Sequence, residues 1–310
     1  MNNSIWRKLS YLILFFIGIF YLYFYHSYLA ILKSLTVGYF VIISVLSFGT
    51  FLFLAIQFKF LVEIFYLNLE FKEWFGLTVI NTMISYYTPA RGGLIARAYY
   101  LNRKYDLPYS KYMSLLGGSY TINFFVASLG IIFFSCFSAF HSGVWNLKIL
   151  GVGIGLLIGT IIFSILLFIG CSRTISFKTG RIFNMINNFM DGMNLFRKHP
   201  FMVLKISFVQ FCLIFIMGGK LYWSFKAVGR SVALIDILVI QSLVVFSMVI
   251  SITPGNLGIK EGIIGLFASQ LGVPFADAIM AASVDRGISM LITFFLGMSY
   301  SKILIDNKSR

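Results

Sequence analysis

The sequence predicts an all-α membrane protein that crosses the bilayer several times. Of its 310 residues, 59% are hydrophobic and only 11% are charged, whereas soluble domains carry roughly 25% charged residues. Long runs contain no Asp, Glu, Lys or Arg, and a bilayer-spanning helix needs about 20 such residues. Because this much apolar surface cannot remain in water, the composition excludes soluble, fibrous and disordered proteins. The uncharged runs are 34–58, 112–145, 149–172 and 237–259.

We predict about six full transmembrane helices. The first follows Arg7 and Lys8 and is dense in Phe and Tyr, with no small-residue cleavage site. We therefore interpret it as an uncleaved helix and not as a signal peptide. The predicted spans are 9–28, 35–57, 111–137, 147–170, 201–224 and 275–301.

Two further apolar stretches, 74–90 and 237–252, run into prolines and glycines. Proline removes a backbone donor and glycine loosens a helix, so each stretch should break within the membrane. The halves on either side are too short to cross comfortably alone. We therefore predict two re-entrant hairpins, at 74–104 and 237–270. The breaks fall at Thr88 and Pro89 in the first hairpin and at Thr253, Pro254 and Gly255 in the second.

The two breaks resemble copies of one unit. Each is followed by glycines, a short half-helix, a second proline (Pro108 or Pro274) and then a full span. This pattern predicts a single membrane domain, 1–310, that contains a first repeat at 1–140 and a second at 141–310.

The distribution of basic residues predicts the topology. The chain has 25 Lys and Arg against 10 Asp and Glu, a net charge of +15, and cytoplasmic loops of membrane proteins collect such residues. The bias explains the charge without a nucleic-acid partner. With the basic clusters inside, both termini are cytoplasmic, the first hairpin enters from the cytoplasm and the second from the exterior. Each half then has three full spans, so the halves are inverted, as in many transporters. We expect a multi-pass protein of the cell (inner) membrane.

The first hairpin offers an anion site. Arg91, Gly92 and Gly93 follow the break, where a half-helix would present free N–H groups within the membrane. The glycines would let a ligand approach the backbone. Farther along, Arg97, Tyr100 and Lys104 recur at helical spacing and form a polar stripe toward the cytoplasm. Arg97, Arg103 and Lys104 could equally be ordinary interfacial positive charges, and this alternative stays open.

The second hairpin carries an intramembrane carboxylate. Gly258, Glu261 and Gly265 share a helical face, and small residues at this spacing allow close helix packing. A carboxylate there needs a partner, and Arg286 in the last span, with Asp285 beside it, is the natural candidate. The pair could serve a substrate or could only lock the hairpin to the helix.

These residues resemble the membrane domain of the lysylphosphatidylglycerol synthase/flippase family, over about residues 10 to 302. The second hairpin has the pattern Pro-Gly-x-Leu-Gly-x-basic-Glu, then Leu-Gly-Val-Pro, then an arginine in the last helix. The matching residues are Pro254 to Glu261, Leu271 to Pro274 and Arg286, and in the first half Asn81, Pro89, Arg91, Gly92 and Arg97.

The resemblance implies a domain that moves lipids, since relatives are proposed to flip aminoacylated phospholipids, other phospholipids or polyprenyl-linked sugars. Two departures are visible. Many relatives have a Glu-Arg pair where this chain has Gly117-Gly118-Ser119-Tyr120. The two-part enzymes carry a soluble aminoacyl-transferase domain after the membrane region, and here the sequence ends at Arg310, so we expect no such activity in these residues.

The leading hypothesis is therefore a lipid flippase or transporter for a phosphate-bearing, anionic lipid, and not an enzyme. A membrane-embedded lipid-modifying enzyme is the alternative, but the ten acids are scattered and His26, His141 and His199 are isolated. An accessory subunit of a partner lipid or glycan synthase also remains open. We expect no cofactor and no metal, because Cys136, Cys171 and Cys212 lack ligand spacing and no Walker-type loop is present. The substrate-binding candidates are Arg91, Gly92, Gly93, Arg97, Asn256, Gly258, Lys260, Glu261 and Arg286.

Overall fold

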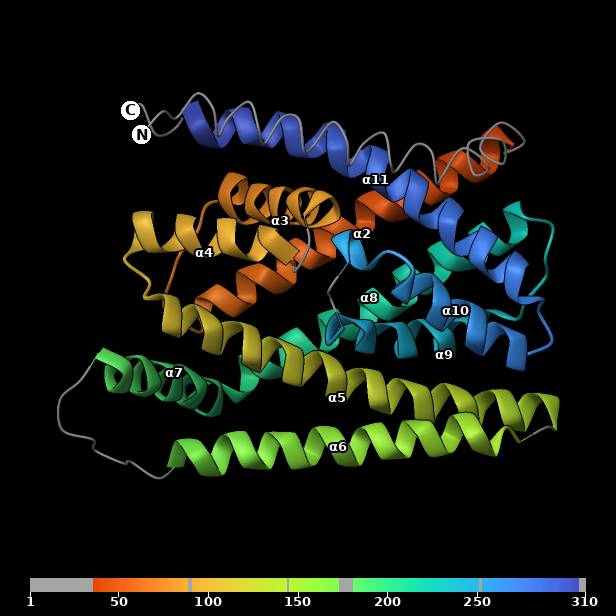
Figure 1. Cartoon of the computed structure of the whole chain (residues 1–310), viewed down its shortest axis with the longest axis horizontal. Helices are drawn as coiled ribbons and strands as arrows, with labels where there is room; N and C mark the ends of the chain where they lie inside the picture. The colour runs from red at the N-terminus through yellow and green to blue at the C-terminus, as the bar shows by residue number, and fades with distance from the viewer. Residues whose placement is uncertain (1–35, 89–90, 144, 173–180, 251–252, 307–310) are drawn as a thin grey trace.

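A computed structural model describes the whole chain except residues 1–35, 89–90, 144, 173–180, 251–252 and 307–310 (Figure 1). Within the described residues every regular element is a helix. The α-helices are α2 (Val37–Glu63), α3 (Phe71–Tyr87), α4 (Gly92–Tyr105), α5 (Tyr109–Ser142), α6 (Leu147–Ser172), α7 (Arg181–Lys198), α8 (Pro200–Ala227), α9 (Leu234–Val245), α10 (Ile259–Gln270) and α11 (Phe275–Asp306).

Five of these helices, α2, α5, α6, α8 and α11, are long and apolar enough to cross a membrane. They coincide with five of the predicted spans. The remaining predicted span, 9–28, lies outside the described residues. In Figure 1, α5, α6 and α11 run along the long axis of the molecule, which is the direction that a membrane normal would take. The prediction of a polytopic helical membrane protein is confirmed.

The first predicted break lies between α3 and α4, which pack against each other. Thr88 is extended (φ −120°, ψ 142°), the conformation that a following proline favours. Arg91 then takes a left-handed conformation (φ 52°) before α4 begins. A Cβ at Gly93 would lie 2.0 Å from the carbonyl oxygen of Asn81. Only glycine therefore permits α4 to approach the α3 backbone this closely.

The second predicted break is also present. α9 passes into a short 3-10 turn at Phe246–Met248, and a second such turn at Pro254–Asn256 precedes α10. Gly255, Asn256 and Gly258 all have positive φ, at 58°, 58° and 78°. Left-handed residues in this number prevent a continuous helix, so the chain must turn here.

The two breaks and the helices around them pack reciprocally. α3 packs on α11, the long helix after the second break, and α9 packs on α5, the long helix after the first. The turn Pro254–Asn256 contacts α3, where a Cβ at Gly255 would lie 2.7 Å from the ring of Tyr86. α2 and α8 pack side by side. The two breaks therefore meet near the middle of the bundle.

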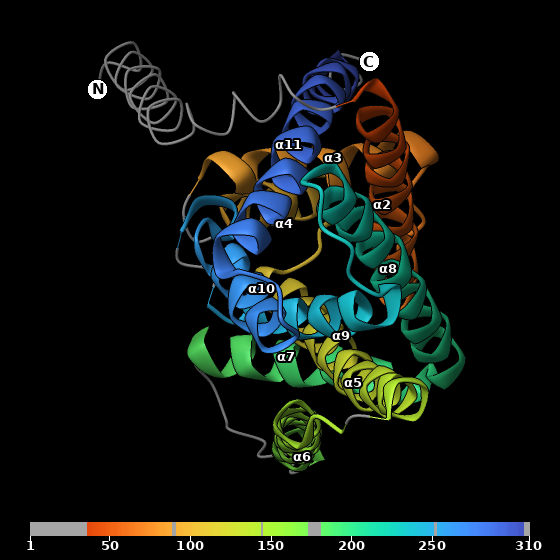
Figure 2. The same cartoon turned by 90° about the vertical axis from the view of Figure 1, so that its right-hand side faces the viewer.

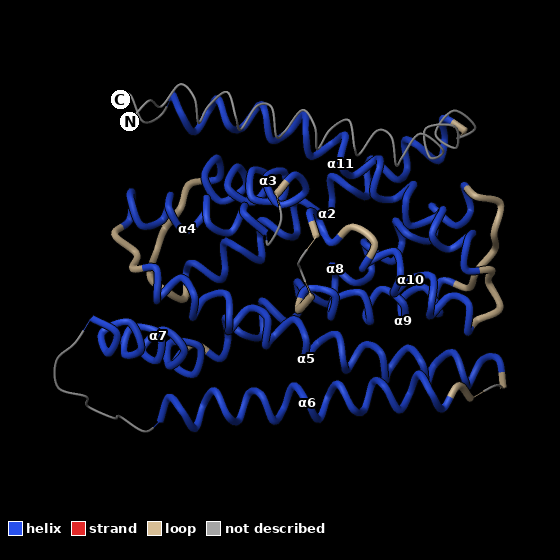
Figure 3. The backbone as a smooth tube through the Cα atoms, in the orientation of Figure 1, coloured by secondary structure: helices blue, strands red, loops and turns tan. Residues whose placement is uncertain are grey.

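One helix was not predicted. It is α7, which lies between the predicted spans 147–170 and 201–224, packs on α5 and α6, and runs across the view above α6 in Figure 2. A Cβ at Gly118 would lie 2.4 Å from the Phe196 ring, and one at Gly192 would lie 1.8 Å from Ser114 Oγ. These two glycines let α5 and α7 pack tightly. The smooth trace of Figure 3 shows how short the loops between the described helices are.

Candidate functional site

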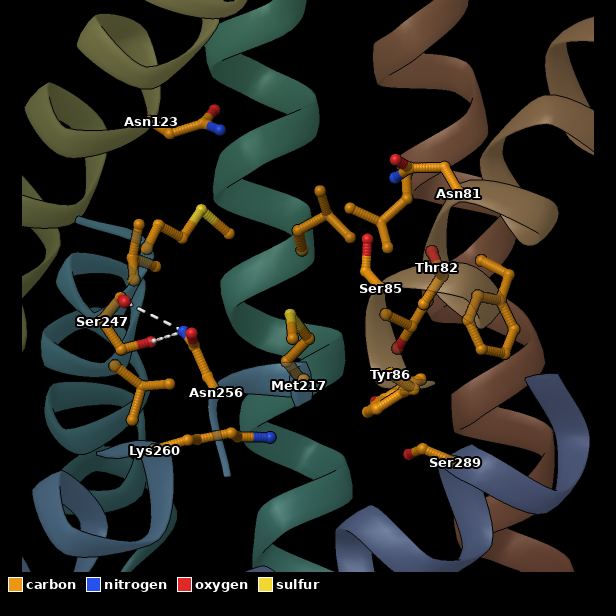
Figure 4. A pocket seen from close by; sticks show the side chains of 18 of the residues that line it. Asn81, Thr82, Ser85, Tyr86, Asn123, Met217, Ser247, Asn256, Lys260 and Ser289 are labelled. Carbon is orange, nitrogen blue, oxygen red and sulfur yellow. Dashed lines mark hydrogen bonds between the residues drawn. The ribbon is translucent and has the colours of Figure 1, made fainter. Parts of the chain in front are cut away.

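A cavity of about 260 Å³, lined by both apolar and polar side chains, lies where the two breaks meet the long helices (Figure 4). Side chains from α2, α3, α5, α8, α9, α10 and α11 reach it, together with Arg91 at the start of α4. Its described lining includes three cationic side chains and six amides but no Asp or Glu. The cations are Arg91, Lys220 and Lys260, and the amides are Gln57, Asn81, Asn123, Gln210, Gln241 and Asn256.

Two lysines from different elements converge beside one carboxylate. Lys220 Nζ in α8 lies 3.0 Å from one oxygen of Asp285, and Lys260 Nζ in α10 lies 2.8 Å from the other. Lys220 also donates to Ser289 Oγ at 2.8 Å. The carboxylate is 2% exposed, whereas both lysines line the cavity. One buried negative charge therefore faces two positive charges, and an anion in the cavity would complete their neutralisation.

Amides form a second group. Gln57 Nε2 donates to Asn123 Oδ1 at 2.9 Å and to Gln210 Oε1 at 3.1 Å, so α2, α5 and α8 are joined through one side chain. All three amides are buried, with exposed fractions of 5% or less. Figure 4 places Asn123 and Asn81 at one end of the cavity and Lys260 and Ser289 at the other. Lys260 and Ser289, to which Lys220 donates, thus lie at the end opposite Asn123 and Asn81, and the amide of Asn256 lies nearer to Lys260.

Two amide oxygens at this cavity accept no hydrogen bond from the described residues. Asn256 Nδ2 donates to the Ser247 carbonyl at 2.9 Å and to its hydroxyl at 3.2 Å, which orients the amide. Its Oδ1 is buried and has no donor within the described part of the chain, and the same holds for Asn81 Oδ1. A buried acceptor without a donor is costly, so both oxygens are suited to a ligand or water that donates.

Arg91 lies where the sequence placed it, at the break and on the cavity. Its Nη1 donates to Tyr120 Oη at 3.1 Å, and its guanidinium lies 5.8 Å from the centre of that ring. No described carboxylate pairs with it. At Gly92 and Gly93, by contrast, the chain itself fills the space, because Cβ atoms there would meet Thr88 and Asn81. These glycines serve the packing of the hairpin.

Arg97 is internal but does not line the cavity. It is 8% exposed, its guanidinium lies 3.9 Å from the centre of the Phe58 ring, and Nη2 is 3.5 Å from Thr78 Oγ1. This overturns the alternative that Arg97 is an ordinary interfacial charge. Arg103 is exposed, as that alternative expected of it.

Tyr100 and Lys104, which were predicted to continue a polar stripe, meet instead on Glu73 in the first turn of α3. Tyr100 Oη donates to Glu73 at 2.7 Å, and Tyr105 Oη and Lys104 Nζ donate at 2.5 Å. Burial by itself would raise the pKa of Glu73, but the hydrogen bonds from these donors outweigh burial and lower the pKa to about 2. The ionised carboxylate joins the outer ends of α3 and α4, neither of which is among the spanning helices.

The predicted partnership of Glu261 with Arg286 is confirmed, since the two side chains form an ion pair. Arg286 also donates to the carbonyl oxygens of Gly255 at 2.8 Å and Asn256 at 3.2 Å. Glu261 accepts from the Gly258 amide at 2.8 Å. Neither member of the pair lines the cavity. Their contacts hold the break in shape, which favours the locking role.

Of the nine predicted binding residues, three line the cavity: Arg91, Asn256 and Lys260. The other six do not line it: Gly92, Gly93, Arg97, Gly258, Glu261 and Arg286. Sequence reasoning missed Lys220 and most of the amides. Lys220 is 4% exposed inside the predicted span 201–224. An ionisable side chain within a span is a functional candidate by default, so this signal was present. In the described residues no group of three or more His, Cys, Asp or Glu side chains could hold a metal ion.

Comparison with known proteins agrees with the resemblance in the motifs. The family described as lysylphosphatidylglycerol synthase TM region matches residues 9–297. A UPF0104 membrane protein of Methanocaldococcus jannaschii is 25% identical over 281 residues, covering 82% of each chain. A UPF0104 membrane protein of Methanothermobacter thermautotrophicus is 33% identical over 116 residues, which are 36% of this chain and 32% of the relative. No solved structure gives a significant match.

Proposed function

The chain belongs to the lysylphosphatidylglycerol synthase TM-region family, and on that premise we propose that it is a lipid flippase. It carries a phosphate-bearing lipid across the cell membrane and makes or breaks no bond in it. The observation that carries the proposal is the cavity between the two breaks, with three cationic side chains in its lining and no described carboxylate. Cations at membrane depth are costly unless a function needs them.

The size of the cavity agrees with a head-group site. At about 260 Å³ it lies just below the usual range of roughly 300–1,000 Å³ for small-molecule sites. A lipid head group could enter it while the apolar tails stay in the bilayer. Lys220, Lys260 and Arg91 would contact the phosphate, and a guanidinium suits a phosphate particularly well because it can form two parallel hydrogen bonds.

In this proposal both hairpins are re-entrant and the two repeats are inverted. The first hairpin enters from the cytoplasm and the second from the exterior, so that both termini are cytoplasmic and the protein resides in the cell (inner) membrane. α3 of the first half packs on α11 of the second, and α9 of the second half packs on α5 of the first. This reciprocal packing supports two related halves. Inverted repeats with broken helices near the midplane provide alternating access in other transporters, which supports the proposal by analogy.

A liposome assay tests the function. The purified protein would be reconstituted with phospholipids that carry a fluorophore on an acyl chain, and an external reductant would report lipid that reaches the outer leaflet. We expect faster exchange than in protein-free liposomes. Arg91→Ala should slow exchange of an anionic lipid without lowering thermal stability, and Arg91→Lys should restore it only in part. Arg103→Ala, at an exposed position of α4, is the matched control and should behave as wild type.

Absence of exchange for every lipid tested would contradict the flippase. It would favour an accessory role beside a lipid or glycan synthase, in which the chain binds lipid without moving it. Loss of folding in Arg91→Ala would instead assign Arg91 to the structure of the hairpin.

A further inference from the structure

We infer that the cavity selects an anionic lipid whose phosphate bears an uncharged, hydroxyl-rich head group, and that it rejects a cationic aminoacyl head group. This inference rests on the proposed function and names the substrate class of the same site. Phosphatidylglycerol is the simplest lipid of the accepted class, and its lysyl ester is the simplest of the rejected class.

The charges around the cavity carry the first step. Lys220 and Lys260 share the single carboxylate Asp285, and Arg91 has no described carboxylate at all. Glu261 is engaged by Arg286 and by the Gly258 amide, outside the cavity. The site therefore retains an excess of two positive charges, and the single negative charge of a phosphodiester neutralises one of them. An additional ammonium would meet like charges with no described carboxylate in the lining to receive it, and like-charge juxtaposition in a buried site strongly disfavours a partner.

The amides carry the second step. Asn256 Oδ1 and Asn81 Oδ1 are buried acceptors that no described donor reaches, and Asn256 is 8% exposed. The amide nitrogen of Asn256 is committed to Ser247, so its oxygen, and not its nitrogen, is available. Gln57 uses its Nε2 group on Asn123 and Gln210, which leaves the amide groups of those two residues able to donate. Hydroxyl groups both donate and accept, and they match such a lining better than methyl groups.

The arrangement of the two ends carries the third step. Lys260 and Ser289 lie at one end of the cavity, whereas Asn123 and Asn81 lie at the other (Figure 4). A phosphate at the lysine end would therefore direct the rest of the head group toward the amides. A site built to bond hydroxyl groups discriminates strongly against an analogue that lacks them, because its own polar groups are then left unpaired.

The test compares head groups on one acyl-labelled lipid backbone with the wild-type protein in liposomes. The probes are phosphatidylglycerol, its lysyl ester, and phosphatidic acid, which has a phosphate but no alcohol. We expect phosphatidylglycerol to exchange at least about tenfold faster than the lysyl ester, and phosphatidic acid to lie between them. An equal or faster rate for the lysyl ester would overturn the inference while leaving the flippase intact.

Two variants locate the discrimination. Lys260→Met should slow the exchange of phosphatidylglycerol and reduce the ratio of its exchange rate to that of the lysyl ester. In this variant Asp285 keeps Lys220 as its partner. Asn123→Leu should slow the exchange of phosphatidylglycerol about tenfold but leave the exchange rate of phosphatidic acid nearly unchanged. The matched controls are Lys226→Met at the end of α8 and Asn184→Leu on an exposed position of α7, neither of which lines the cavity. Equal losses for both lipids in Asn123→Leu would contradict the hydroxyl-binding role.

A binding measurement separates failure of this inference from failure of the proposed function. Short-chain forms of the same three lipids would be added to the detergent-solubilised protein and its thermal stability followed. If no lipid is moved in liposomes, the flippase fails. Greater stabilisation by dihexanoyl phosphatidylglycerol than by its lysyl ester would still support the selectivity, and the reverse order would overturn it.

Discussion

At the scale of single residues, the ion pair between Glu261 and Arg286 shapes the second break and does not line the cavity. Arg286 holds two carbonyl oxygens of the break as well as the carboxylate of Glu261, and Glu261 caps the amide of Gly258. Glu261 and Arg286 do not line the cavity, whereas Gly255 and Asn256, whose carbonyl oxygens Arg286 holds, do. The pair therefore shapes the loop that presents Asn256 and Lys260 to the cavity, and it need not touch a lipid to be indispensable.

A double-mutant cycle tests this role. Glu261→Ala and Arg286→Ala should each destabilise the protein by about 3–5 kcal/mol, because each leaves a buried charge without its partner. The double variant should lose clearly less than the sum of the two losses. Thermal unfolding in detergent is the measurement. The pair of Arg230 with Asp277 is the control, since its side chains are 49% and 21% exposed, and its cycle should stay within about 1 kcal/mol.

Additive losses would contradict the coupling that the structure shows. The liposome assay adds a second criterion. If the double variant folds and regains lipid exchange, the pair is a lock. Continued loss of exchange in a folded double variant would assign the pair to the substrate.

At the scale of elements, the close approach of α4 to α3 depends on Gly93. A Cβ there would lie 2.0 Å from the Asn81 carbonyl oxygen, a backbone atom that cannot move alone. Gly93→Ala should therefore separate the two half-helices and destabilise the protein by about 1–3 kcal/mol. Gly155→Ala in α6 is the control, because nothing lies within 4 Å of a Cβ at that position. Alanine there should leave the melting temperature unchanged or slightly raised. Equal melting temperatures for both variants would contradict the tight hairpin.

The outer ends of the same hairpin depend on Glu73. Its pKa in the folded state is about 2, below the ordinary value of 4.5, so its contribution to stability is fully present above pH 4.5. The contribution is lost as the pH falls toward 2. Wild type should therefore lose more thermal stability over this range than Glu73→Gln, which is already uncharged. At neutral pH, where the carboxylate is ionised, Glu73→Gln should have a lower melting temperature than wild type. Parallel pH profiles for the two proteins would show that the carboxylate does not join α3 to α4.

Sequence patterns predicted the spans and breaks because each has a local cause. Uncharged runs of spanning length become α2, α5, α6, α8 and α11, and proline after an extended Thr88 ends α3. The helix α7 was missed because its apolar residues are interspersed with polar ones and its length falls short of a span. Amphipathic periodicity was the signal that could have revealed it.

The site was less predictable, because it is assembled from distant segments. Arg91, Asn256 and Lys260 could be named from their places beside the breaks. Lys220 could not be linked to Asp285 without knowing that α8 packs on α11. For the same reason nothing in the sequence brought Gln57 next to Gln210, which are 153 residues apart. Long-range pairing of polar residues leaves no local pattern.

At the scale of the whole molecule, the inverted arrangement requires that the first half begins in the cytoplasm and ends outside, and that the second half begins outside and ends in the cytoplasm. The loop after α4, with Asp106, and the junction of α7 with α8, at His199, should be cytoplasmic. The turns at Gly143 and Gly229 should be exterior. Each of these positions lies between helices or at a helix end. Nothing lies within 4 Å of a Cβ at Gly143 or Gly229, so a cysteine there meets no neighbour, although their positive φ (72° and 77°) adds some backbone strain. An odd number of crossings separates each cytoplasmic position from the next exterior one.

Single cysteines at these positions, in a background without Cys136, Cys171 and Cys212, test that arrangement in intact cells. A membrane-impermeant thiol reagent should label Gly143→Cys and Gly229→Cys but should label Asp106→Cys and His199→Cys only after the membrane is permeabilised. Since Asp106 and Gly143 flank the single long helix α5, opposite labelling of this pair establishes that α5 spans. Labelling of His199→Cys from outside would place α8 in the reverse direction. The two halves would then enter the bilayer in the same sense, and the cavity could not lie between inverted repeats.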